Sequence, residues 1–237
     1  MNVSGKTAIV FGGTSGIGLA TCKSLCHLGA HKVYAVSRKP KKIQFEHPNI
    51  VPVSVDVLQE DALQSFFANT GSIDILVSTA TGGKRATGPF LDMDMQGYKD
   101  SFAKLWGYTH VVRYGCNYIK PNGCIVLVSG SPAKHCKSGQ IALSSVGSAI
   151  ESFARGVAKE IAPIRINVVS PGIIDTPMVS HVHGDARTQY YQHVVQHHLI
   201  PRPGTADEVA KGIVFAIEND FITGTTIEID GGFLLSP

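Results

Sequence analysis

Short runs of consecutive apolar residues recur along this chain and alternate with helical patterns. Seven of these runs predict strands, at residues 8–11, 33–36, 50–55, 73–77, 125–128, 166–169 and 226–229. Helical patterns occupy residues 17–28, 61–68, 98–119 and 141–161, and a capping box at 205–208 opens a helix to about 217. Because strands that are apolar throughout need cover on both faces, this order predicts a parallel sheet between helices, which is the α/β doubly wound fold.

The domain organisation follows from length and continuity. The 237 residues contain no repeat, no low-complexity linker and no break in composition, so we expect a single domain spanning residues 1–237. The least regular stretch is 176–202, which is rich in His and Gln. In this architecture it stands where a lid over the substrate is expected.

Composition narrows the class of function. Charged residues make up 16% and the net charge is +3, which excludes a disordered polyelectrolyte and argues against a nucleic-acid partner. No apolar run approaches the roughly 18 residues of a membrane span. The first residues lack a signal-peptide pattern, and the five cysteines fit a reduced, cytoplasmic protein. The low charge content also favours buried subunit contacts.

The turn after the first predicted strand is rich in glycine, with the spacing Gly12-x-x-x-Gly16-x-Gly18. Glycines here let a pyrophosphate approach the backbone, and the helix behind the turn offers unpaired N–H groups. The pattern therefore predicts a dinucleotide site, and a glycine-rich turn without a ligand is the alternative. Its residues are Gly12, Thr14, Ser15, Gly16, Ile17 and Gly18.

The glycine turn and several later motifs together make the chain resemble a short-chain dehydrogenase/reductase of the classical type over its whole length. Asp56-Val57 follows the third strand, 166–172 matches the family's sixth strand and turn, and 222–224 and 230–232 match its C-terminal pattern. The resemblance implies a single-domain Rossmann fold with a seven-stranded parallel sheet. It further implies a homo-oligomer, dimer or tetramer, formed through 98–119, 141–161 and 225–235. Implied cofactor contacts are Asp56, Val57, Thr79, Ala80, Thr81, Pro171, Gly172, Ile174 and Thr176.

The end of the second strand discriminates between cofactors. An acidic residue there would accept a hydrogen bond from the ribose 2′-hydroxyl of NAD, whereas this chain has Ser37-Arg38-Lys39. A hydroxyl and two cations suit a 2′-phosphate, which arginine binds bidentately, so we expect NADP(H). The alternative is a solvated basic loop, because Lys41 and Lys42 follow.

The family's four catalytic positions carry other residues in this chain. Aligned on the family pattern, the tyrosine position falls on Leu143 and the lysine position on Gly147. The serine position falls on Gly130, and the asparagine position falls on Lys104. No tyrosine lies between residues 119 and 189, so no shift of register restores the motif.

Two residues are candidates for the catalytic work. We expect Lys104 to replace the cation missing at Gly147, with room left by the glycine, and either to bond the nicotinamide ribose or to polarise a carbonyl. A lysine at the helix surface or at a subunit contact is the alternative. Ser129 ends the fifth strand, at the sheet edge where ligands bind. Its alternative is a hydrogen bond within the loop.

Histidines gather in the predicted lid, at His181, His183, His193, His197 and His198, with Asp185 nearby. Their spacing matches no known metal site, so no metal is expected. Contact with a ligand, a pH-sensitive lid charge or a solvated loop are the alternatives. A further histidine, His135, is expected to border the pocket mouth, where an acidic ligand would meet it.

Three functions remain open at this stage. The first is an NADP(H)-dependent oxidoreductase with a non-standard site that acts on a small carbonyl or ring substrate. The second is a non-redox isomerase or cyclase that uses the same pocket. The third is a catalytically silent protein, either a cofactor-binding sensor or the partner of an active homologue.

Overall fold

The computed structural model describes residues 1–40, 47–81, 83, 85–179 and 183–236. Seven parallel strands form one sheet in the order β3-β2-β1-β4-β5-β6-β9. The strands are β1 Thr7–Phe11, β2 Lys32–Ser37, β3 Ile50–Ser54, β4 Ile73–Ser78, β5 Ile119–Val128, β6 Arg165–Pro171 and β9 Thr226–Ile229. The predicted α/β doubly wound fold with a seven-stranded parallel sheet is confirmed.

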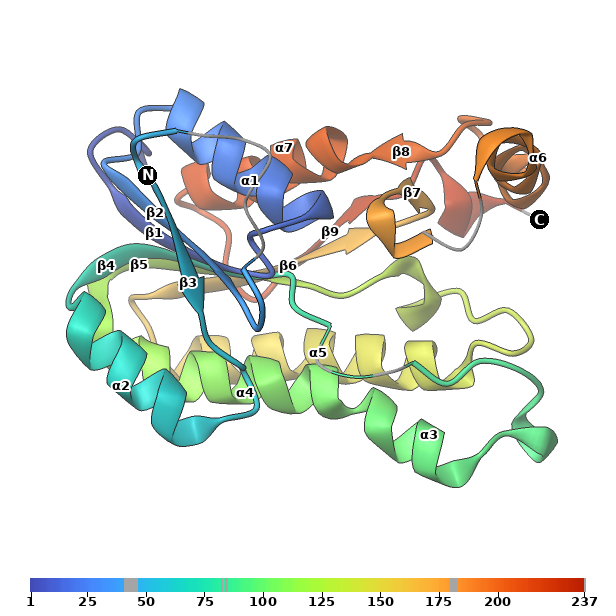
Figure 1. Cartoon of the computed structure of the whole chain (residues 1–237), viewed down its shortest axis with the longest axis horizontal. Coiled ribbons are helices and arrows are strands. Elements are labelled where there is room, and N and C mark those ends of the chain that lie inside the picture. Colours follow the sequence, from blue (N-terminus) through green and yellow to red (C-terminus); the bar gives the residue numbers. More distant parts are fainter. Residues whose placement is uncertain (41–46, 82, 84, 180–182, 237) are drawn as a thin grey trace.

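Helices cover both faces of the sheet (Figure 1). On one face lie α1 Gly16–His27 and α7 Ala206–Glu218; on the other lie α2 Glu60–Thr70, α4 Ala103–Gly115 and α5 Ile141–Glu160. Beyond them lie α3 Met95–Ser101 and α6 Gly184–Val195. Short 3₁₀ helices are η1 Phe90–Asp92, η2 Cys116–Tyr118, η3 Ser131–Ala133, η4 Pro177–Val179 and η5 Phe233–Leu235.

The strands alternate their side chains between two apolar cores. Ile9 and Phe11 of β1 pack with α2, α4 and α5, whereas Ala8 and Val10 pack with α1 and α7. All four are fully buried. Since β1 pairs with β2 on one side and β4 on the other, the chain reverses its winding direction at β1. In doubly wound folds ligands bind at this switch point, outside the carboxyl ends of the strands.

The helix predicted over 98–119 is wrong in its extent. The structure has two helices, α3 and α4, that meet at Phe102, and residue 119 already belongs to β5. The Ser101 hydroxyl donates to the Gly97 carbonyl at 2.9 Å, a back-bond that bends helices. The break places Lys104 in the first turn of α4.

The stretch expected to form an irregular lid contains regular structure. After β7 (Ile174–Asp175), which pairs with β8 (Gly204–Thr205), come η4 and α6. Figure 1 shows α6 at one end of the molecule, close to β7, β8 and the C-terminus. Arg187 of α6 donates to the Thr176 carbonyl at 3.0 Å and forms an ion pair with Asp175. These contacts fasten α6 to the segment that follows β6.

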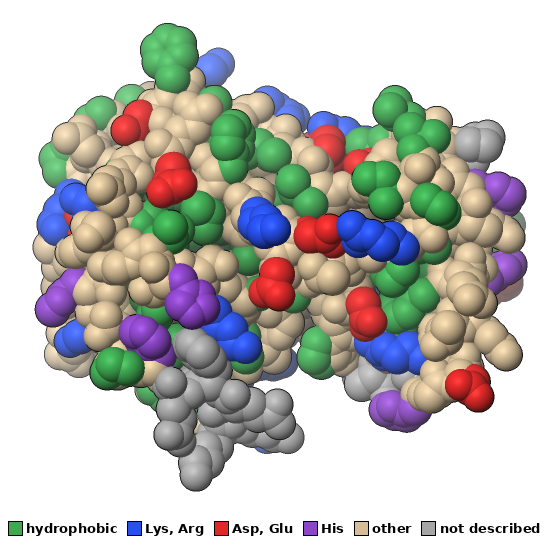
Figure 2. All heavy atoms as spheres, turned by 90° about the horizontal axis from the view of Figure 1, so that it is seen from above, with side chains coloured by type: hydrophobic (Ala, Val, Ile, Leu, Met, Phe, Trp, Pro, Cys, Tyr) green, Lys and Arg blue, Asp and Glu red, His purple; other side chains and the backbone are tan. Residues whose placement is uncertain are grey.

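The face formed by α1 and α7 carries mixed side chains. Figure 2 shows acidic and basic groups interspersed over it, with hydrophobic side chains between them. Within the described part of the chain, no helix combines the length and apolarity needed to cross a membrane.

Candidate active site

The glycine turn brings three backbone segments into close approach. A Cβ placed on Gly18 would lie 2.1 Å from the Gly12 carbonyl oxygen, so only glycine lets α1 start this close to the turn. Gly12 itself has φ +79°, which favours glycine. Across the turn, the Thr79 hydroxyl donates to the Phe11 carbonyl at 3.0 Å. The turn is therefore fixed against the ends of both β1 and β4.

The first turn of α1 is left without a side-chain cap. Ser15 stands at the N-cap position with extended backbone, yet its hydroxyl accepts no hydrogen bond from the helix. By contrast, α7 begins with a complete capping box formed by Thr205 and Glu208. The first turn of α1 holds no acidic residue either. Its N–H groups are thus available to an anion such as a pyrophosphate.

A cavity of about 190 Å³ opens beside this turn, at the carboxyl ends of β1, β2 and β4. We refer to it as the cofactor pocket. It brings together nine of the predicted cofactor residues: Gly12, Thr14, Ser15, Ser37, Arg38, Asp56, Val57, Ala80 and Thr81. Segments from four parts of the sequence thus converge on one cavity.

Other predicted cofactor residues do not line the cofactor pocket. Lys39 is exposed and is absent from the pocket wall. Ile17 packs against the core below α1. Thr176 lies beside Gly16, because a Cβ added to Gly16 would come within 3.7 Å of its Cβ.

The residues after β6 are held by packing. Gly172 is pressed against Asp230, whose Cα would lie 2.8 Å from an added Cβ, and its N–H donates to the Ile229 carbonyl. Ile174 packs against Gly204 across the β7–β8 pair. Pro171 is buried at the end of β6. These contacts bring Thr176 towards the glycine turn, whereas Gly172 and Ile174 do not line the cofactor pocket.

One polar atom in the cofactor pocket fits an oxyanion particularly well. The Ser37 hydroxyl is buried and has no hydrogen-bond partner among the described residues. A buried unpaired hydroxyl costs free energy unless a ligand supplies the missing bond. Since Arg38 lines the same cavity, this end of it is built for a phosphate.

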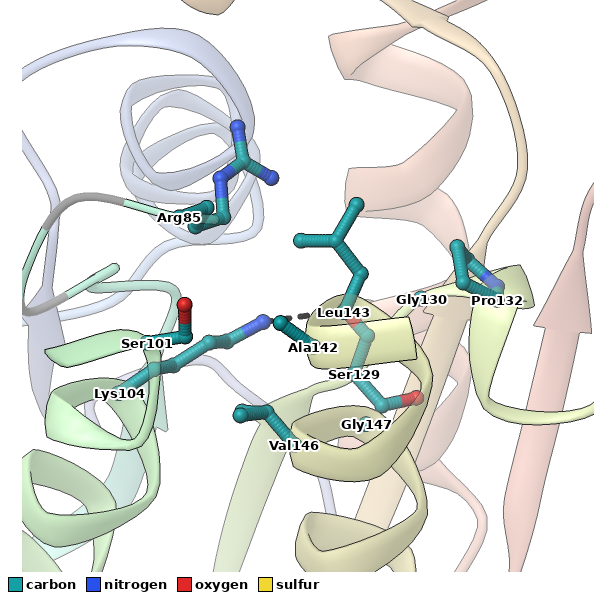
Figure 3. A pocket seen from close by; sticks show the side chains of 10 residues that line it. All are labelled: Arg85, Ser101, Lys104, Ser129, Gly130, Pro132, Ala142, Leu143, Val146 and Gly147. Carbon is teal, nitrogen blue, oxygen red and sulfur yellow. Dashed lines mark hydrogen bonds between the residues drawn. The ribbon is translucent and has the colours of Figure 1, made fainter. Parts of the chain in front are cut away.

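A second cavity lies at the end of β5, the strand next to β4 (Figure 3). Its volume is about 70 Å³, smaller than the 190 Å³ of the cofactor pocket, and we refer to it as the substrate pocket. Its wall consists of Arg85, Ser101, Lys104, Ser129, Gly130, Pro132, Ala142, Leu143, Val146 and Gly147. The two cations among these ten residues have no acidic counterpart in the lining.

Lys104 reaches into the substrate pocket from the first turn of α4. Its Nζ donates to the backbone carbonyl of Ser129 at 3.1 Å and lies 5.6 Å from the ring centroid of Tyr108. Burial, with a smaller contribution from the charge of Arg85, lowers the pKa of Lys104 to about 7. An amine with that pKa holds or releases a proton near neutral pH.

Ser129 uses its two oxygens in opposite directions. The carbonyl accepts from Lys104, while the hydroxyl donates to Oε1 of Glu151 at 3.1 Å. Figure 3 shows the hydroxyl turned away from the Lys104 amine. Glu151 is buried, and burial raises the pKa of its carboxyl. Ser129 therefore positions Lys104 through its backbone, and its hydroxyl is engaged elsewhere.

The helix that carries a tyrosine and a lysine in the family has apolar or small residues facing this pocket. Leu143, Val146 and Gly147 of α5 line it. A Cβ added at Gly147 would lie 2.9 Å from the Cβ of Ala133 in η3. The glycine thus permits the close approach of η3, and it lines the same pocket as Lys104.

The histidines do not converge. His193 and His197 are exposed, His183 precedes α6, and His181 lies outside the described residues. His198 and His135 each pack against the ring of Phe233, with centroids 5.0 Å apart, and neither lines the substrate pocket. Within the described ranges, no group of three or more His, Cys, Asp or Glu side chains is arranged to hold a metal ion.

Two charged residues at the site were not predicted from the sequence. Arg85 lies in the irregular segment after β4, where periodicity gives no position to a side chain. The sequence does indicate a role for Glu151. This residue falls four positions after Gly147 on the buried stripe of α5, together with Ile150 and Ala154. A charged residue on such a stripe indicates a buried polar contact.

Comparison with known proteins agrees with this geometry. The family model described as Enoyl-(Acyl carrier protein) reductase matches residues 12–234. The chain is 31% identical to carbonyl reductase family member 4 of Xenopus tropicalis, over 97% of this chain and 98% of that protein.

Two solved structures share the fold and carry a cofactor in their descriptions. A small-chain dehydrogenase in complex with NADPH is 29% identical, with a TM-score of 0.82 over 98% of this chain and 99% of that one. ElxO with NADP bound is 26% identical, with a TM-score of 0.88 over 98% of this chain and 99% of that one.

Proposed function

The chain belongs to the short-chain dehydrogenase/reductase family of oxidoreductases, and from this premise we propose that it uses NADP(H) to reduce a small carbonyl compound beside Lys104. The observation that carries the proposal is the pairing of two cavities at one sheet edge. The cofactor pocket ends at β4, and the substrate pocket, with the Lys104 amine inside it, begins at the adjacent β5. A cofactor spanning this edge would meet a substrate next to Lys104.

The residues of the cofactor pocket fit NADP(H). The uncapped first turn of α1 would bind the pyrophosphate, and Asp56 and Val57 would contact the adenine. The unpaired Ser37 hydroxyl and the Arg38 guanidinium would bind the 2′-phosphate. When bound, NADPH would supply a hydride to the carbonyl carbon. Two structural relatives, one in complex with NADPH and one with NADP bound, support this choice.

Lys104 is the proton donor in this proposal. α5 contains no tyrosine, so the acid must come from another element. The Lys104 amine, held by the Ser129 carbonyl, would donate a proton to the carbonyl oxygen and regain one from water. A group whose pKa lies near the working pH is well suited to such a transfer. The same amine would polarise the carbonyl before reduction.

Cofactor preference gives the first test. We expect NADPH to bind at least about tenfold more tightly than NADH, since a charge-assisted hydrogen bond contributes about 1.5–3 kcal/mol. Arg38→Ala should remove most of this difference by weakening NADPH alone. The matched control is Lys39→Ala, because Lys39 is the adjacent cation but does not line the cofactor pocket. Fluorescence titration measures the affinities of the unaltered protein and of both variants for NADPH and for NADH.

The outcomes separate the candidate functions. Equal affinities for the two nucleotides in the unaltered protein would contradict the NADP(H) assignment. Oxidation of NADPH with a panel of carbonyl compounds tests the reduction itself. Binding of NADPH without oxidation would favour a silent cofactor-binding protein. Product formation without cofactor consumption would favour an isomerase or cyclase.

A further inference from the structure

We propose that the substrate is an organic anion, an oxo acid whose carboxylate binds Arg85 while its carbonyl oxygen faces Lys104. The inference rests on the proposed function, because it names the class of substrate that the same pocket would accept. It goes beyond that function by assigning a role to Arg85 and a charge to the substrate.

The charge balance of the substrate pocket is the first argument. Of the ten residues that line it, Arg85 and Lys104 are charged and both are basic. The buried carboxylate of Glu151 is outside this lining and accepts a hydrogen bond from the Ser129 hydroxyl. A bound anion would therefore meet two positive groups without facing an acidic side chain in the lining.

The two cations differ in exposure, which separates their roles. In Figure 3 the Lys104 amine points to Ser129, while the Arg85 side chain lies apart from both. Arg85 is exposed and Lys104 is half-buried. A guanidinium forms two parallel hydrogen bonds with a carboxylate and stays charged at any physiological pH. An amine of lowered basicity suits the reacting oxygen instead. An oxo acid would satisfy both groups with one molecule.

The opposite wall selects for an apolar body. Leu143 and Val146 of α5, with Pro132 of η3, line the side of the pocket that faces the two cations (Figure 3). Removing their surface from water favours a hydrocarbon group by about 25 cal/mol per Å². The pocket thus combines two cations on one wall with apolar side chains on the other. An oxo acid that carries a hydrocarbon substituent has the matching arrangement.

The anion in question is distinct from the cofactor phosphate. The 2′-phosphate is assigned to Ser37 and Arg38, which line the cofactor pocket and are absent from the substrate pocket. Arg85 and Lys104 are in turn absent from the cofactor pocket. Each cavity therefore has its own basic residues.

A matched pair of probes tests the proposal by binding rather than by turnover. Benzoylformate carries a carbonyl, a carboxylate and a phenyl ring, and its methyl ester differs by the missing charge. We expect calorimetry on the protein, with and without NADP⁺, to show about tenfold or greater preference for the acid, as one charge-assisted contact predicts. Arg85→Gln should abolish the preference by weakening the acid alone. Phenylphosphonate in a third titration shows whether another oxyanion is accepted equally.

The controls make the result decisive. Lys99→Gln removes a cation from the exposed surface of nearby α3 and should leave the preference intact. Arg85→Lys keeps the positive charge but lacks the planar guanidinium that forms two parallel hydrogen bonds. This variant should therefore retain part of the preference for the acid. Equal binding of acid and ester, a preference that survives Arg85→Gln, or no saturable binding of the acid in the millimolar range would each overturn the proposal. The NADPH titrations test the cofactor assignment alone, whereas the acid and ester titrations test the substrate class. An error about the substrate is therefore distinguished from an error about the cofactor.

Discussion

At the scale of single residues, the lowered basicity of Lys104 is the property with the clearest kinetic consequence. Its amine is buried, lies in the first turn of α4 where the helix end is partially positive, and has Arg85 as its charged neighbour. All three disfavour the ammonium form, whereas the Ser129 carbonyl favours it. The amine therefore changes its charge near neutral pH, unlike an exposed lysine.

This gives a pH prediction for the reductive direction. Since the proton donor must be protonated, kcat/KM should be constant below the pKa of about 7 and should fall as the pH rises through it. Lys104→Gln should lower turnover by about a hundredfold or more, the usual contribution of a positioned acid. The affinity for NADPH should change little. Steady-state kinetics over a range of pH and nucleotide titration measure the two effects.

NMR of the lysine side chains tests the lowered pKa of Lys104 independently. In protein labelled at the lysine ε-carbon, one resonance should titrate near neutral pH and should be missing in Lys104→Gln. A matched loss of NADPH affinity and turnover in that variant would instead assign Lys104 to the nicotinamide ribose. A pH profile that is flat from 6 to 9 would contradict the donor role, because that range brackets the pKa of about 7.

The sequence predicts Lys104 at the pocket because the family pattern fixes its position on a helix. It does not predict Arg85, because an irregular segment has no periodicity to orient a side chain. It also placed Ser129 in the site without revealing which of its oxygens would face the pocket. That orientation depends on Glu151, a buried acceptor on α5, and thus on tertiary packing.

At the scale of elements, α5 and η3 fit together through one glycine. Gly147 allows η3 to approach so closely that an added Cβ would lie 2.9 Å from that of Ala133. Gly156, which follows in the same helix, has no atom within 4 Å of an added Cβ. These two glycines offer a matched comparison within α5.

The two alanine substitutions should have opposite signs. Gly147→Ala forces η3 away from α5, and overpacking of this kind costs about 1–3 kcal/mol. Gly156→Ala places a better helix former at an open position and should stabilise by up to about 1 kcal/mol. Thermal unfolding should show a lowered Tm for the first variant and a raised Tm for the second. If both rise, the close approach of α5 and η3 does not contribute to stability.

The helices and strands also show where the sequence patterns predict structure and where they do not. Strand runs predicted the seven strands of the sheet to within a few residues, except that β5 begins earlier, because uninterrupted apolar runs are specific to buried strands. The break between α3 and α4 was missed because apolar periodicity continues across Phe102. There the Ser101 back-bond competes with the helical hydrogen bonds. Likewise α6 was missed because its polar sequence carries little amphipathic signal.

At the scale of the whole molecule, the low charge content predicts an oligomer, and the structure sharpens where the contact would lie. Glu151, one of the few charges of α5, is buried inside the protomer and so does not belong to the outer surface. On neighbouring α4 the Trp106 side chain is 59% exposed, and near the C-terminus Leu235 is 78% exposed. Both residues fall within the segments expected to meet a second subunit.

The expected state in solution is a dimer or a tetramer at micromolar concentration. Trp106→Glu should shift the protein towards monomer, since it replaces an apolar contact with a charge that would be buried at the interface. Leu91→Glu is the matched control, because Leu91 is 92% exposed but lies in η1, outside the predicted contact. Light scattering after size-exclusion chromatography measures both masses. Since the cofactor pocket is lined within one protomer, NADPH affinity should survive dissociation. A monomeric unaltered protein would refute the assembly itself.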